Sequence, residues 1–116
     1  PITTADATSE GTSVALANAL KAAYNAHRVS TEMHSAADAT NATAAADATN
    51  LATAQTLLNE LKADFNAHVA TAVHRPGVFT PVTVTTADAS DQTTANALAN
   101  ALKVAFNTHV ASGAIS

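Results

Sequence analysis

Three histidines recur at a constant interval and are the side chains of this chain best placed for chemistry. His27, His68 and His109 are separated by 41 residues each and close three similar stretches. Imidazole nitrogens bind zinc and nickel, so three of them at one level of a helical bundle would form a metal or anion site. Two other roles are open: a packed ring that donates to a backbone carbonyl near a helix C-terminus, and a pH-sensitive assembly contact. No carboxylate follows the histidines at a fixed spacing, which favours the packed ring.

The other groups with chemical potential are few. His34 and His74 follow two of the repeated histidines at unequal distances, and together with Asp38 they would complete a site, although such residues more often lie in turns or interfaces. No nucleophile motif, paired-carboxylate constellation or glycine-rich phosphate loop is present. We therefore do not expect an enzyme. We expect no cofactor apart from a metal ion at the repeated histidines.

The histidines belong to a repeat without insertions, and a repeat of this length indicates a repeat architecture. The 116 residues suffice for one modest domain. We predict a single domain, 1–116, of three repeats at about 5–45, 46–86 and 87–116. The aspartates that keep the same step are predicted as helix N-caps: Asp6, Asp47 and Asp88.

Each repeat predicts one long helix, so the predicted fold is mainly α, a bundle of three helices at about 12–28, 48–70 and 89–110. A short helical piece is also predicted to begin at Asp38. One face of each helix carries leucines, an aromatic residue and the histidine, and the opposite face carries asparagine and lysine. That opposite face is either solvated or a contact surface. If it is a contact surface, its interface residues include Asn18, Asn59 and Asn100.

The connectors between the helices are long, roughly 18 to 20 residues, where antiparallel neighbours need fewer. Either they climb back along the bundle, so that the helices run parallel around a pseudo-threefold axis, or they carry minor helices between antiparallel units. The constant period favours the parallel arrangement. In the second connector, residues 78–86 have alternating β-branched character, and Pro81 restricts them to an edge strand or extended arm. Four of its residues are predicted to contact a neighbouring chain: Val78, Phe79, Val82 and Val84.

Composition limits the partners. Five lysines and arginines are scattered among nine acidic residues, so no nucleic-acid surface is indicated. No apolar run approaches the ~20 residues of a membrane helix. Large apolar side chains are scarce among many alanines, and burying alanine stabilises little. We therefore expect a thin core that neighbouring copies complete, in a homo-oligomer or multicopy assembly.

The repeated pattern Leu-x-Asn-x-Leu-Lys-x-x-(Tyr/Phe)-Asn-x-His resembles a repeat of uncharacterised structural proteins of tailed bacteriophages. The matching segments are Leu16–His27, Met33-His34, Ala37–Asn41, Leu57–His68, Val73-His74 and Leu98–His109. The resemblance implies a virion component made in the host cytoplasm, such as a capsid decoration or cement protein or a neck or tail-associated protein. Its partners would be other virion, capsid or tail proteins, and no catalytic residue is implied. The alternative from the residues themselves is a small metal- or ligand-binding helical module that uses the repeated histidines.

Overall fold

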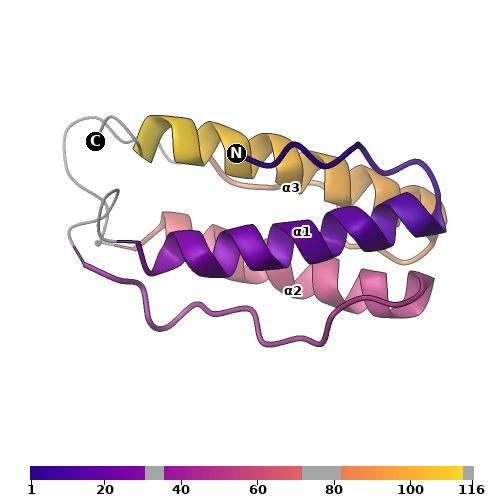
Figure 1. The fold of residues 1–116 in the computed structure, drawn as a ribbon, viewed down its shortest axis with the longest axis horizontal. Coiled ribbons are helices and arrows are strands. Elements are labelled where there is room, and N and C mark those ends of the chain that lie inside the picture. The colour runs from indigo at the N-terminus through magenta and orange to yellow at the C-terminus, as the bar shows by residue number, and fades with distance from the viewer. Residues whose placement is uncertain (31–35, 72–81, 114–116) are drawn as a thin grey trace.

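Three long helices make up the fold in the computed structural model, which describes residues 1–30, 36–71 and 82–113. They are α1 (Glu10–Arg28), α2 (Leu51–Val69) and α3 (Gln92–Gly113). Each helix packs against the other two, and the molecule is a short rod of 39 × 22 × 21 Å (Figure 1). The predicted mainly α bundle of three helices is confirmed. None of the described helices is long and apolar enough to cross a membrane.

Each helix begins four residues after its predicted aspartate, so the predicted N-caps are wrong. Ser9 caps α1, and its hydroxyl and the Thr12 side chain form a reciprocal capping box. The same box recurs in the other repeats, as Asn50 with Thr53 and Asp91 with Thr94. A side-chain acceptor followed three residues later by threonine satisfies the first backbone donors of a helix. Each of the three aspartates instead pairs with a lysine of a neighbouring helix. The pairs are Lys21–Asp47, Lys62–Asp88 and Lys103–Asp6.

All three helices run in the same direction, because each connector returns along the bundle before the next helix starts. The Glu10 carboxylate at the start of α1 accepts a hydrogen bond of 2.8 Å from the backbone N–H of Leu51 at the start of α2. In Figure 1 the segment before α1 follows α3, and the segment before α2 runs along the outside of the α1/α2 pair. Of the two predicted arrangements, the structure has the parallel one.

Asparagine side chains hold the returning segments against the helices. The side-chain oxygen of Asn18 accepts from the N–H of Ala48 at 2.7 Å, and its amide nitrogen donates to the carbonyl of Ala48 at 2.9 Å. Within the described residues the same two bonds recur six times: Asn18 with Ala48, Asn25 with Thr43, Asn59 with Ala89, Asn66 with Val84, Asn100 with Ala7 and Asn107 with Ile2. We call these pairs the asparagine clamps. Each one gives an extended residue the donor and acceptor that a neighbouring strand would supply.

The clamps correct the predicted role of Asn18, Asn59 and Asn100. The sequence places them on an outward face open to solvent or to a partner, yet the chain's own connectors cover that face. The physical reason is the return path of the connectors, since a parallel bundle must bring each of them back across a helix pair. These amides are therefore used inside the molecule.

The described part of the predicted arm, residues 82–86, also lies on its own bundle. Val84 is 4% exposed and is clamped by Asn66, and Val82 is partly buried against the core. No β-strand occurs within the described ranges, and Val78 and Phe79 lie outside them. Extended residues such as Ile2, Ala48 and Val84 join the core. The apolar flanks of the helices are thus covered by the chain itself, where the sequence predicted cover from neighbours.

The core is built in layers of equivalent residues, one from each helix. Two leucine layers are followed by an aromatic layer and then by the histidines. The layers are Leu16, Leu57 and Leu98; Leu20, Leu61 and Leu102; Tyr24, Phe65 and Phe106; and His27, His68 and His109. Because the helices are parallel and in register, a 41-residue period places equivalent side chains at the same level. This arrangement positions the candidate site.

Candidate metal centre

The three repeated histidines meet in the interior, near the C-terminal end of the bundle. His68 and His109 are fully buried and His27 is 7% exposed. Their ring centroids are 4.7 to 5.2 Å apart, and each pair of rings is nearly perpendicular, at 84 to 90°. One nitrogen from each imidazole can be chosen so that all three lie within 4.8 Å of one another. The three rings therefore surround one point on the bundle axis.

One pair of ring nitrogens is close enough either for a hydrogen bond or for binding a shared metal ion. Nε2 of His68 lies 3.3 Å from Nε2 of His109. This separation fits a hydrogen bond in which one nitrogen carries the proton. It also fits two ligands of one ion, since bonds of 2.0–2.1 Å at tetrahedral angles set nitrogens ~3.3 Å apart. In the hydrogen bond the two nitrogens point at each other, whereas as ligands both would point at one ion between them.

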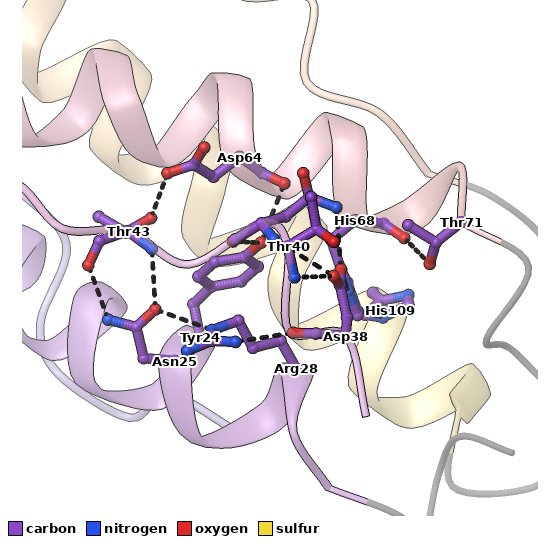
Figure 2. A network of polar contacts seen from close by, with 11 residues as sticks. Tyr24, Asn25, Arg28, Asp38, Thr40, Thr43, Asp64, His68, Thr71 and His109 are labelled. Atoms are coloured by element: carbon purple, nitrogen blue, oxygen red, sulfur yellow. Dashed lines mark hydrogen bonds and ion pairs between the residues drawn. The ribbon is translucent and has the colours of Figure 1, made fainter. Parts of the chain in front are cut away.

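Asp38 provides a carboxylate next to the histidines (Figure 2). Its Oδ2 lies 2.8 Å from Nδ1 of His68, and the residue is only 3% exposed. Burial alone would raise the pKa of this carboxyl. Hydrogen bonds from Asn41, from His68 and from the N–H of Thr40 outweigh burial and hold the pKa at about 2. Asp38 is therefore ionised and can only accept, so Nδ1 of His68 carries the proton and Nε2 faces the axis.

The backbone of Asp38 is fixed by the end of α1. Its N–H donates to the carbonyl of Arg28 at 2.7 Å, and the Arg28 guanidinium donates to the Asp38 carbonyl at 2.7 Å. The prediction that a short helix begins at Asp38 is wrong, because no helix lies between α1 and α2 in the described residues. Oδ1 of Asp38 accepts from the N–H groups of Thr40 and Asn41 in a tight turn. The connector thus delivers one carboxylate to a histidine 30 positions further along the chain.

The sequence groups Asp38 with His34 and His74 as a candidate site, and both histidines lie outside the described residues. The missed link is the pair Asp38–His68. The sequence Asp38-Ala39-Thr40-Asn41 signals a local turn, but it does not reveal which helix end the turn touches. Only the return path of the connector determines that contact.

Tyr24 ties the same connector to the aromatic layer. Its hydroxyl lies 2.5 Å from the carbonyl oxygen of Asn41 and 2.9 Å from that of Asp64. Its ring meets the His68 ring edge to face at a centroid distance of 5.7 Å. Burial, and then the charge of Asp64, raise the pKa of Tyr24, so the phenol stays protonated. The other repeats have phenylalanine here, which leaves this hydroxyl without a counterpart.

The carboxyl of Asp64 accepts a hydrogen bond of 2.8 Å from the Thr43 hydroxyl. Burial raises the pKa of Asp64, and the bond from Thr43 lowers it in part. Figure 2 shows Asp64 and Thr43 on the side of Tyr24 away from the histidines. Asp64 thus anchors the connector and does not belong to the histidine cluster.

One hollow reaches the histidine layer from outside. It has a volume of about 260 Å³ and lies between α1 and α3, and its lining includes Ala23, Ala26, His27, Phe106 and Val110. A second hollow of about 360 Å³ lies between residues 82–86 and α3 and contains no histidine. Among the described residues, the three repeated histidines form the one group of three or more potential ligands close enough to hold a metal ion. Small ligands therefore have a route to His27.

The fold and the site define a class: a single-chain parallel three-helix bundle of pseudo-threefold symmetry with a buried histidine layer. Comparison with protein-family models, with curated proteins and with solved structures gave no match.

Proposed function

We propose that this protein is a structural component of a larger particle, of the virion kind that its repeat resembles, and that it acts through protein–protein contacts. The observation that supports the proposal is the structural role of each residue in the repeat motif. Its leucines, aromatic residue and histidine fill the core, its asparagines clamp the connectors and its lysine pairs with an aspartate. Every recurring motif position thus specifies shape. A motif of this kind is typical of a rigid building block.

The outer surface supports the same role. At three equivalent levels the exposed positions of the helices carry small residues: Ala15, Thr56 and Ala97; Ala22, Ala63 and Val104; Ala26, Ala67 and Thr108. Small side chains lose little conformational entropy when a neighbour packs on them. Val104 is the larger exception, since it is 67% exposed and borders the hollow beside residues 82–86. We infer that contacts with other particle proteins use this face of α3.

A metal-binding role is the second candidate, favoured by the meeting of the three imidazoles on the axis. It is compatible with a structural role, because an ion held by one side chain from each helix would lock the bundle together. It needs no partner protein, so it can be tested separately.

The test is the presence of the chain in purified particles. Particles from the cells that naturally make the protein are banded in a density gradient, washed with salt and quantified by mass spectrometry. We expect the chain at many copies per particle. Its absence from the washed particles would refute the structural role.

A matched pair of variants tests the face. Val104→Glu adds a charge beside the second hollow, and Ala63→Glu adds the same charge at the equivalent exposed position of α2. Purified variants compete with the natural protein for binding to particles stripped of it. We expect Val104→Glu to lose binding and Ala63→Glu to keep it, whereas equal binding by both would exclude the α3 face.

A further inference from the structure

We propose that His27, His68 and His109 bind one divalent transition-metal ion of the zinc class, with Asp38 as the carboxylate that orients His68. This proposal rests on the second candidate function, metal binding, and specifies its ion and its ligands. It starts from placement: three helices each deliver one buried imidazole to the same point, and the Nε2 atoms of His68 and His109 already have the spacing of two ligands of one ion.

The carboxylate supplies an observation independent of the three histidines. Metal-binding histidines usually donate their second ring N–H to a carboxylate or carbonyl, which fixes the tautomer and increases ligand basicity. Asp38 Oδ2 accepts from Nδ1 of His68 at 2.8 Å, which turns Nε2, the nitrogen that would bind the ion, toward the axis. The remaining acceptor sites of Asp38 are occupied by Thr40 and Asn41. The whole carboxylate–histidine unit is therefore held in one orientation.

The contacts of Asp38 favour a cation over an anion. Its carboxylate is buried beside the rings and accepts hydrogen bonds from His68, Thr40 and Asn41, so it acts only as an acceptor there. Arg28, the cation nearest along the chain, donates to the backbone carbonyl of Asp38. A divalent ion on the axis would compensate the carboxylate through His68, whereas an anion would add a second negative charge to the same interior.

The donor atoms select the class of ion. Three imidazole nitrogens suit zinc, nickel, cobalt and copper, and the hard oxygen-seeking ions calcium and magnesium are disfavoured. The described set contributes three ligands, so a fourth position is left for water. His27 has the most exposed of the three rings and lines the hollow of about 260 Å³, which supplies the route for the ion and the water.

Little movement is needed to close the site. The three nitrogens lie within 4.8 Å of one another, and ligands of one tetrahedral ion lie ~3.3 Å apart, so binding requires a movement of at most ~1.5 Å. The leucine and aromatic layers next to the histidines are buried, so we expect the side chains to make this movement and the helices to keep their places.

Cobalt titration of the purified full chain tests the proposal. The protein is first stripped with a chelator and then titrated with Co²⁺ while the visible d–d absorption is recorded. We expect one equivalent to bind with an intense, low-symmetry spectrum, zinc to displace the cobalt, and zinc to raise the melting temperature. Failure of the folded, stripped chain to take up either ion would overturn the proposal.

Variants locate the ligands. His109→Gln keeps the size and polarity of the side chain but removes the imidazole, and we expect it to lose at least ~100-fold in affinity. Asp38→Asn keeps the shape of the orienting residue, and we expect a loss of ~10–100-fold. The double change His34→Gln with His74→Gln is the control, since it removes two histidines outside the proposed set, and it should bind as tightly as the natural chain. Circular dichroism confirms that each variant is folded.

The opposite pattern would refute the assignment. If His109→Gln binds as well as the natural chain, or if the control loses the ion, the ligands are other residues. If chloride raises the melting temperature and zinc does not, the layer is an anion site. Particle association is measured on the metal-free protein as well, so the failure of one proposal is distinguishable from the failure of the other.

Discussion

The asparagine clamp at Asn100 makes a prediction about the segment that precedes α1. Asn100 of α3 holds Ala7, 93 positions away in sequence, through bonds of 2.7 and 3.0 Å. Asn18 and Asn59 make the same bonds to Ala48 and Ala89. Residues 1–9 are also held by the Asn107–Ile2 clamp and the Lys103–Asp6 pair. Removing the Asn100 clamp alone therefore leaves the segment docked.

The magnitude follows from the contacts. Asn100→Ala removes two hydrogen bonds, worth about 1 kcal/mol each, and leaves the N–H and C=O of Ala7 without their partner in a position that is only 3% exposed. Because the segment stays docked, the loss of unfolding free energy is about 2–4 kcal/mol. We expect a loss of the same size for Asn18→Ala, whose clamp holds Ala48 in the same way.

Urea unfolding followed by circular dichroism gives the free energies of unfolding. Native-state hydrogen exchange of the Ala7 amide shows whether that N–H has lost its hydrogen bond. Asn96→Ala is the control, because Asn96 lies on the same helix and contacts Gln92 instead of an arm. It should change stability by less than about 0.5 kcal/mol. If Asn100→Ala leaves both the unfolding free energy and the exchange of the Ala7 amide unchanged, the clamps do not hold the arms.

Three further changes test other parts of the structure. The pKa of Asp38 is held at about 2, below that of an unfolded aspartate, so its ionised form adds about 2 kcal/mol to the unfolding free energy above roughly pH 4, and this contribution is lost as the pH falls toward 2. The difference in unfolding free energy between the natural chain and Asp38→Asn, measured by urea unfolding, should therefore shrink over that pH range. A constant difference would contradict the assignment. Gly11→Ala should raise the unfolding free energy by about 0.5–1 kcal/mol, because Gly11 is helical and an added Cβ would meet nothing within 4 Å; a lower melting temperature would count against this. Lys103→Ala should cost less than about 1 kcal/mol, since the Asp6 partner is largely exposed, and a larger loss in low salt and in high salt alike would show that the pair does more than a surface salt bridge.

The period of the repeat predicted the three-helix bundle and its apolar stripe, and it favoured the parallel direction while leaving the antiparallel one open. His27, His68 and His109 keep the same step as the core leucines, so parallel helices bring them to one level. Helix starts were predicted less well. Asp6 and its equivalents share the period with the true caps, and a period alone cannot tell an aspartate that pairs with lysine from one that caps a helix.

The return path of the connectors could not be predicted, and two errors follow from it. Asn18 lies opposite the apolar stripe, where a helix considered alone is solvated, and only the neighbouring segment turns its side chain into a clamp. Asp38 reaches His68 because the first connector passes the end of α2. Contacts of this kind join segments with no common periodicity, so pattern analysis of one helix at a time does not find them.

The clamps also close the three repeats into a ring around one axis. Each helix holds the extended segment that precedes the next helix, and α3 holds the segment that precedes α1, so Asn107 meets Ile2 across 105 positions. In an open solenoid the end repeats are covered by terminal repeats that differ from the rest. Here each of the three helices holds a returning segment of the same chain. Side chains at three equivalent positions meet only on the shared axis, at one level for each set of core residues. The histidines occupy one such level, which is why a single residue type in the repeat is enough to build a site.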